Sequence, residues 1–232
     1  MKAWTWLEVK TEVQEDLDLL EEKGITPANL LNWANEAIDE AEAIIHNLFQ
    51  DYFFTDNTSD PIDLVAGTSD YSLPSDIFAQ RIRYLHYNDG VDSYKIQKAS
   101  MGDIAYLTER NQEYGQTFYQ YKVMNSLSGG VRIRLFPTPQ SNVTNAITVY
   151  YIRNAREITA DADVIDIPEF INFIKQYIKV RAYEKDIGNP MLQKAIADLS
   201  RERQIMVNVL STHTDDGVDP LEPNLEDYVE HT

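Results

Sequence analysis

The densest run of apolar positions lies between residues 168 and 183 and predicts a helix that is covered on several sides. The apolar residues in it are Phe170, Ile171, Phe173, Ile174, Tyr177, Ile178, Val180, Ala182 and Tyr183. Because they occupy most of the helical circumference, other elements must pack around this helix. Pro168 suits the first turn, where a missing N–H has no helical partner anyway, and Gly188 is typical of the residue after a helix end.

Three further helices are predicted from apolar stripes at helical spacing. The first spans residues 5–23, with Thr5 and Glu8 placed as a capping box, and the second starts at Thr26 and runs to about residue 50. In the last, residues 191–210, the inward positions are expected to be Leu192, Ile196, Leu199, Met206, Val209 and Leu210. The acidic residues opposite the stripe of the first helix are interpreted as a solvated face; they are Glu12, Glu15, Asp16, Asp18, Glu21 and Glu22.

Between these helices the pattern changes to strand-like alternation of apolar and polar positions. Strands are expected at residues 80–87, 92–97, 117–124, 131–136 and 146–153, with two short strands between residues 64 and 74. A short helix is expected from Ser100 to Arg110. The predicted fold class is therefore α+β, a helical bundle formed by the N- and C-terminal helices with a β-rich insertion in the middle.

The same pattern divides the chain into expected domains. Residues 1–60 and 161–212 are predicted to form the bundle, and residues 61–160 the β-rich insertion. Residues 213–232 have no basic residue and two prolines, which predicts an extended acidic C-terminal tail. The tail still carries apolar residues, among them Leu221, Leu225, Tyr228 and Val229. A segment that folds on a partner and a plain solubilising tail are equally compatible with this pattern.

Charge is unevenly distributed and limits the possible partners. The formal net charge is −18; residues 1–60 carry 3 basic and 14 acidic side chains, and residues 213–232 carry none and 7. Electrostatic binding of nucleic acid needs a basic face, so the overall charge argues against a nucleic-acid-binding protein. The same charge suits a surface past which DNA moves without binding. Arg81 with Arg83, and Arg132 with Arg134, share strand faces that fit a nucleic-acid or protein contact, but a solvated sheet face is favoured.

Signals for chemistry are few. The chain has no cysteine, no motif for a nucleophile or a phosphate-binding loop, and no apolar run long enough to predict a membrane-spanning helix. The four histidines, His46, His86, His213 and His231, lack metal-site spacing. Carboxylates at residues 161–166 offer oxygen ligands for Ca²⁺ but lack the glycine and final glutamate of an EF-hand loop, so stabilisation of the next helix start is favoured. We therefore expect no catalytic residue, metal or cofactor, although a carboxylate pair brought together by the fold stays open as a hydrolase.

Several segments together resemble the head-to-tail adaptor (connector, or head-completion) proteins of tailed bacteriophages, podovirus-like ones in particular. They are the helix of residues 28–49 that ends in aromatics, the segment Ala66-Gly-Thr-Ser-Asp-Tyr-Ser-Leu-Pro-Ser-Asp76, the segment Phe136-Pro-Thr-Pro139 followed by Ile147-Thr-Val-Tyr-Tyr151, and the helix opened by Ile167-Pro168. The resemblance spans nearly the whole chain. The long β-rich middle departs from minimal adaptors and leaves its own role open.

The resemblance implies a structural virion protein of the neck rather than an enzyme. It implies a ring of about twelve copies that joins the portal to the tail tube or nozzle proteins, with genome DNA passing through the lumen. The protein would be assembled in the host cytoplasm and reside at the head-tail junction, without a membrane or a cofactor. The tail would bind the portal or a neighbouring subunit; the residues for this contact are Leu221, Pro223, Leu225, Tyr228 and Val229. The alternative is a β-rich module of a phage tail that binds carbohydrate or a receptor.

Overall fold

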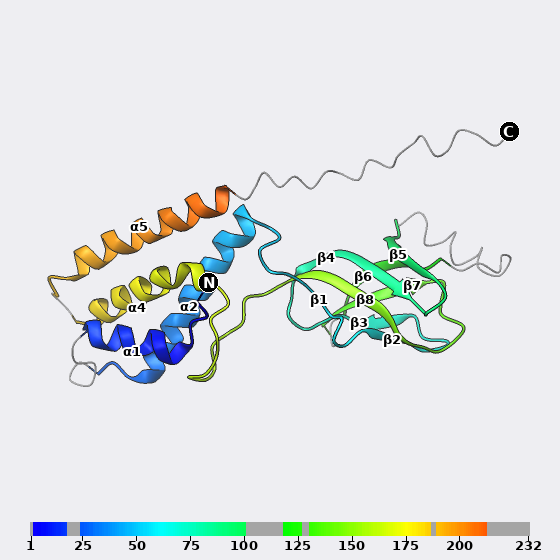
Figure 1. Ribbon diagram of the computed structural model, residues 1–232, viewed down its shortest axis with the longest axis horizontal. Coiled ribbons are helices and arrows are strands. Elements are labelled where there is room, and N and C mark those ends of the chain that lie inside the picture. The colour runs from blue at the N-terminus through cyan, green and yellow to red at the C-terminus, as the bar shows by residue number, and fades with distance from the viewer. Residues whose placement is uncertain (1, 18–23, 101–117, 127–129, 187–188, 213–232) are drawn as a thin grey trace. The chain divides into compact units, whose positions relative to one another are not determined.

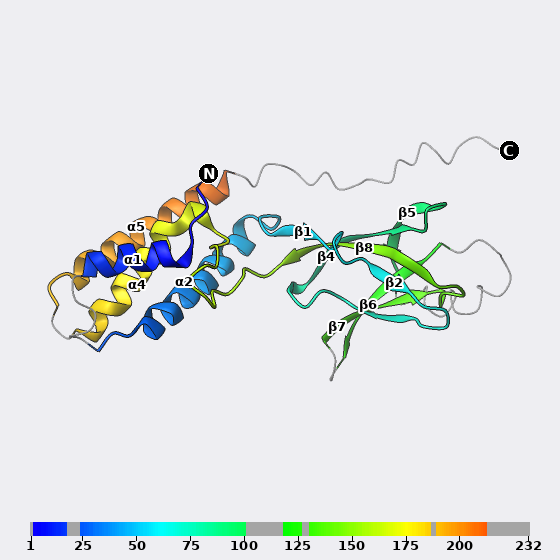
Figure 2. The same cartoon turned by 60° about the horizontal axis from the view of Figure 1, so that its bottom comes forward.

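The structure is a computed structural model that describes residues 2–17, 24–100, 118–126, 130–186 and 189–212. The chain divides into two compact units. One consists of residues 1–50 together with residues 155–232, and the other of residues 51–154. Figures 1 and 2 show that helices gather in the first unit and strands in the second. Each unit has its own buried side chains, so each is considered by itself.

The helical unit is organised around one helix. It contains α1 (Trp6–Leu17), α2 (Pro27–Leu48), the 3-10 turn η2 (Pro168–Phe170), α4 (Ile171–Lys185) and α5 (Leu192–Ser211). α4 contacts α1, α2 and α5. Its buried residues are Ile171, Phe173, Ile174, Ile178, Val180 and Ala182, which confirms the prediction of a helix covered on several sides. Ala34, Ala37 and Ala41 of α2 are buried too, and their small side chains permit close helix packing.

Side-chain caps fix where the first two helices begin. The Thr5 N–H donates to Glu8 Oε2 at 2.9 Å, and the Glu8 N–H donates to Thr5 Oγ1 at 3.4 Å. This is the predicted capping box. Thr26 caps α2 in the same reciprocal way with Asn29, and Pro27 occupies the first turn. The starts of α1 and α2 are therefore encoded locally, whereas α4 and α5 begin without a side-chain cap.

The segment between the strands and η2 is held against the N-terminal helices. The Asn35 side chain accepts from the Ile158 N–H at 2.9 Å and donates to the Ile158 carbonyl at 3.0 Å. The Trp6 N–H donates to the Asp163 carbonyl at 2.9 Å, and Thr5 forms an isolated bridge with Val164. The returning chain is thus fixed before it enters α4.

The second unit is one curled sheet with eight described strands. They are β1 (Phe54–Asp56), β2 (Ile62–Leu64), β3 (Asp70–Ser72), β4 (Ile77–Asn88), β5 (Ser93–Lys98), β6 (Gln120–Ser126), β7 (Gly130–Phe136) and β8 (Val143–Arg153). The order is β1-β8-β4-β5-β6-β7-β3, and β2 also pairs with β8. Neighbours are antiparallel except β5 and β6, which are parallel. The enclosed core includes Leu85, Ile96, Ile133, Leu135, Ile147 and Val149.

The predicted fold class, a bundle of terminal helices with a β-rich insertion, is wrong. The strands form one large sheet with its own core, a compact unit rather than an insertion carried by a bundle. The physical reason is the length of β4 and β8, 12 and 11 residues, each paired with strands on both sides. A sheet of this size with a buried face can support itself. The short helix expected at residues 100–110 lies outside the described residues except for Ser100.

Candidate functional site

Four ion pairs cross between the helices of the first unit. The cations come from α4 and α5, and the carboxylates from α1 and α2; the pairs are Lys175 with Glu12, Lys179 with Asp16, Arg181 with Glu36, and Arg203 with Glu40. The distance is 2.6 Å for Lys179–Asp16 and 2.8 Å for Arg181–Glu36. Each pair is partly exposed, so each stabilises by about 0.2–1 kcal/mol. Together they fix the faces on which the helices meet.

The acidic face predicted for the first helix is exposed where the structure describes it. The side chains of Glu12 and Asp16 are 46% and 53% exposed, and their carboxylates reach lysines that are only 11% and 18% exposed. A long lysine stem can lie along apolar surface while its ammonium reaches the rim, which sequence periodicity alone does not reveal. Asp18, Glu21 and Glu22 lie outside the described residues.

The carboxylates at residues 161–166 close their own loop. Asp163 Oδ2 accepts from the Thr159 N–H at 2.7 Å and from the Ala160 N–H at 2.8 Å, and these bonds hold the pKa of that carboxyl below its usual range. Asp161 pairs with Lys10 at 2.5 Å, and Asp166 accepts from the Arg156 N–H at 2.8 Å. Loop closure thus occupies Asp161 and Asp163, while Glu169 lies in the first turn of η2, where a carboxylate near the helix start was predicted. Among the described residues, no three carboxylates or histidines are grouped as metal ligands.

Two of the candidate strand arginines, Arg134 and Arg83, are neutralised by carboxylates of the sheet unit. Arg134 Nε and Nη2 donate to the two oxygens of Asp70 at 2.6 and 2.7 Å, which lowers the pKa of Asp70 and raises that of Arg134. Arg83 pairs with Asp51, and the Arg81 guanidinium lies 5.2 Å from the ring centroid of Phe78. Arg83 and Arg134 therefore add no surplus positive charge to the basic face that nucleic-acid binding would need.

An aromatic ladder crosses β1, β8 and β4. The ring centroids of Tyr84 and Tyr150 are 4.2 Å apart with an interplanar angle of 16°, and Phe54 stacks on Tyr150 at 6.2 Å. The Lys95 ammonium lies 5.5 Å from the centroid of Tyr84. Because Tyr150 lies between Tyr84 and Phe54, its two ring faces are occupied, although Phe54 is 47% exposed. The ladder therefore leaves the binding-module alternative to experiment.

The outer flanks of α5 are apolar and exposed. Leu199, Met206 and Leu210 are buried as predicted, but Ile196 and Val209 are 41% and 40% exposed, which contradicts their predicted inward position. Ile205 is 45% exposed as well. The apolar arc of α5 is thus wider than the surface that α4 and α2 cover. Ile196 lies on the opposite flank of the helix from Ile205 and Val209, so these residues do not form one contiguous apolar patch.

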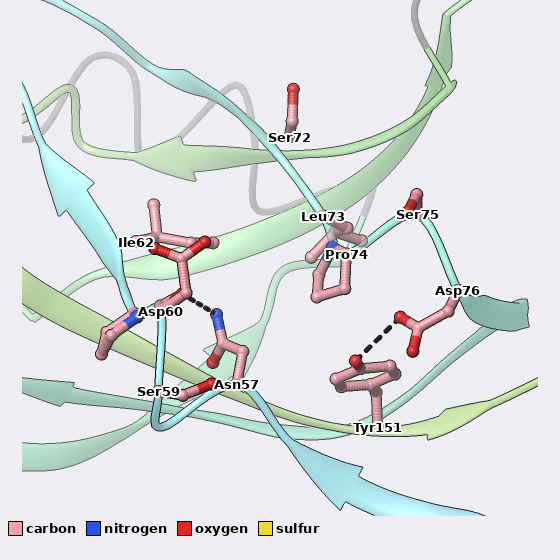
Figure 3. A pocket seen from close by; sticks show the side chains of 11 residues that line it. Asn57, Ser59, Asp60, Ile62, Ser72, Leu73, Pro74, Ser75, Asp76 and Tyr151 are labelled. Atoms are coloured by element: carbon pink, nitrogen blue, oxygen red, sulfur yellow. Dashed lines mark hydrogen bonds between the residues drawn. The ribbon is translucent and has the colours of Figure 1, made fainter. Parts of the chain in front are cut away.

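A pocket of about 660 Å³ opens in the sheet unit (Figure 3). Its wall comes from the segment before and into β2, from the end of β3 and the following loop, and from one residue of β8. The lining residues are Asn57, Ser59, Asp60, Pro61, Ile62, Ser72, Leu73, Pro74, Ser75, Asp76 and Tyr151. Sequence analysis did not identify this site, although part of the wall lies in the 66–76 segment that carried the family resemblance.

Two hydrogen bonds order the pocket wall. The Tyr151 hydroxyl donates to Asp76 Oδ1 at 2.8 Å, and Asn57 Nδ2 donates to the Asp60 carbonyl at 3.0 Å (Figure 3). Tyr151 is 5% exposed, and its burial, together with the bond to Asp76, raises the pKa of the phenol. Tyr151 therefore stays neutral and acts as a fixed donor to Asp76.

The other predicted site residues fall into two groups. His46 is buried beside Glu42, with Nε2 3.4 Å from Oε1, and His86 Nε2 lies 3.0 Å from Ser93 Oγ. His213, His231 and the predicted partner-binding residues of the tail lie outside the described residues; the latter are Leu221, Pro223, Leu225, Tyr228 and Val229. Within the described part of the chain, no helix combines the length and apolar composition needed to span a membrane.

Comparison with known proteins identifies the class of this chain. A family model of phage head-to-tail adaptors matches residues 4–219, which include nearly all the described residues of both units. The chain belongs to the SU10 adaptor protein family. No curated protein matches it in sequence. The family membership supports the resemblance to head-to-tail adaptors and a structural role in the phage neck.

Proposed function

We propose that this chain is a structural virion protein that joins the portal to the tail as an oligomeric ring through which genome DNA passes. The family match over residues 4–219 carries the proposal. Closed rings with repeated heterologous contacts are the usual way in which identical chains surround an axis, and about twelve copies are proposed here. The podovirus-like arrangement, the assembly in the host cytoplasm and the contacts with tail tube or nozzle proteins belong to the same proposal.

Charge supports passage of DNA without binding. The formal net charge of the chain is −18, and the four interhelical ion pairs use basic side chains of α4 and α5 inside the subunit. A lumen lined by a surplus of carboxylates repels the phosphate backbone, so DNA slides rather than adheres. No membrane, metal, cofactor or catalytic step is part of this function.

The tail is proposed to bind the portal or the neighbouring subunit. Its apolar residues are separated by acidic ones, so each can enter a pocket of a partner while the charges keep the free chain soluble. The proposed contacts are Leu221, Pro223, Leu225, Tyr228 and Val229.

Native mass of the full chain, alone and with the portal protein, tests the proposal. A species of about 320 kDa, twelve chains of 26.7 kDa, or a monomer that joins the portal is the expected result. A chain shortened to residues 1–212 should keep its circular dichroism but bind the portal more weakly. A monomer or trimer that does not bind the portal would contradict the proposed ring and favour the carbohydrate- or receptor-binding alternative. Unchanged portal binding by the shortened chain would remove only the role of the tail.

A further inference from the structure

The pocket of the sheet unit is lined by the segment that leads into β2, by the end of β3 with the loop after it, and by Tyr151 of β8. In the described chain β2 pairs only with β8, and β3 pairs only with β7, so neither of these short strands pairs with the other. The Tyr71 hydroxyl of β3 nevertheless reaches the β2–β3 turn, where it accepts from the Val65 N–H at 3.1 Å and donates to the Thr68 carbonyl at 2.8 Å. The two strands are thus tied at one point, and the pocket lies beside it.

The chemistry of the pocket wall is that of a site for a cation. Asp60 and Asp76 contribute carboxylates, and Ser59, Ser72 and Ser75 contribute hydroxyls. None of the described residues that line the pocket is basic. The charge of Arg153 acts on the pKa of Tyr151, but Arg153 does not line the pocket. Its guanidinium lies 5.3 Å from the ring centroid of Phe53 and donates to the Asn154 carbonyl at 2.9 Å.

Size and shape favour a polypeptide segment over a bare ion. A volume of about 660 Å³ falls within the roughly 300–1,000 Å³ of pockets that hold organic ligands. The apolar side chains Ile62, Leu73 and Pro74 line the same space, so a ligand with an aliphatic stem and a charged end matches both parts of the wall. Arginine and lysine side chains have this form.

The chain's own tail is excluded as occupant by charge. Residues 213–232 carry seven acidic side chains and no basic one, so they would be repelled by Asp60 and Asp76. The occupant we consider is therefore a segment of another polypeptide that presents a basic side chain.

We propose that this pocket binds an arginine- or lysine-bearing segment of a partner protein, with the basic group between Asp60 and Asp76. Tyr151 holds the Asp76 carboxylate in place through its hydroxyl, which leaves carboxylate acceptor capacity for the incoming cation. The inference does not depend on ring formation or on the portal.

A matched pair of peptides tests the proposal. The probes are two short acetylated peptides of serine, threonine and valine, one with a central arginine and one with citrulline, its uncharged isostere. Each is titrated into the isotopically labelled full chain, and the amide signals of residues 57–62 and 72–76 and the ring of Tyr151 are followed. The arginine peptide should shift these signals, and the citrulline peptide should bind at least roughly tenfold more weakly, since a charge-assisted hydrogen bond is lost.

Variants of the chain show whether the arginine peptide binds in the pocket or is attracted by the negative charge of the whole protein. Asp76→Asn keeps an oxygen that accepts from Tyr151, so it should fold normally and bind the arginine peptide roughly tenfold more weakly; Asp60→Asn should act in the same way. The control Asp92→Asn removes one exposed carboxylate of the same unit outside the pocket. Equal weakening by the control, or equal binding of both peptides, would overturn the proposal. Shifts of the same signals by a neutral trisaccharide, without a response to the arginine peptide, would overturn it too and assign the pocket to a glycan.

Discussion

The bond between Arg134 and Asp70 shows at the scale of one residue how the sheet unit uses its charge. The guanidinium holds both oxygens of the carboxylate and ties β3, an edge strand, to β7. Bidentate geometry of this kind orients a strand as well as neutralising a charge. Both side chains are more than a third exposed, so solvent reduces the gain to within about 1 kcal/mol.

A pH series checks this contribution. The folded-state pKa of Asp70 is lowered from 3.8, chiefly by the hydrogen bonds from Arg134, so the stabilisation is present above the unfolded pKa and is lost as pH falls through the folded value. Asp70→Asn should lower the free energy of unfolding in urea by up to about 1 kcal/mol at pH 7. The difference from the parent chain should shrink between pH 4 and pH 2, and a constant difference would contradict the assignment.

At the scale of elements, α4 is the centre of the helical unit, and one side chain tests this. Phe173 is 1% exposed, whereas its neighbour Asn172 lies on the exposed face. Phe173→Ala leaves a cavity and should cost about 3–5 kcal/mol of unfolding free energy. Asn172→Ala should stay within about 0.5 kcal/mol, because nothing buried is removed. Similar losses in the two variants, measured by urea unfolding, would show that α4 is not covered as described.

Elements were more predictable than their assembly. The caps at Thr5 and Thr26 and the apolar run of α4 are local signals, and each was predicted from residues within one or two helical turns. Alternation predicts that a strand exists but not its neighbours, so the parallel pairing of β5 with β6 was missed. β1 was missed because Phe54–Asp56 is too short to show a period.

The pocket could not be predicted for the same physical reason. Its wall joins residues 57–62 and 72–76 with Tyr151. The Tyr151 hydroxyl donates to Asp76, a residue that is 75 positions earlier in the chain. Such contacts depend on sheet register, and register is set by long-range pairing rather than by local composition. The register irregularity of β2 against β8 adds to this: Ile62 pairs with Ile147 and Leu64 with Val143, so two steps along β2 are opposed by four along β8.

At the scale of the whole molecule, the two units predict two folding domains. Residues 51–154 contain a complete hydrophobic core and begin and end side by side, because Phe54 pairs with Ile152 and the Arg153 N–H donates to the Phe53 carbonyl at 3.1 Å. A segment whose ends meet can leave the chain without opening its sheet. Residues 51–154 expressed alone should therefore give a dispersed amide spectrum that overlays on that of the full chain.

A second fragment tests where the sheet unit begins and ends, in addition to whether it folds alone. Residues 61–160 contain β2 to β8 but lack β1, so one side of β8 loses its partner over residues 150–152, where Tyr150 stacks on Phe54. An unpaired edge of this kind exposes backbone donors and favours aggregation. The longer fragment should be the more stable in urea and the more soluble of the two. If both fragments are unfolded, the sheet unit needs the helical unit to fold; if both are equally stable, β1 contributes nothing to the sheet.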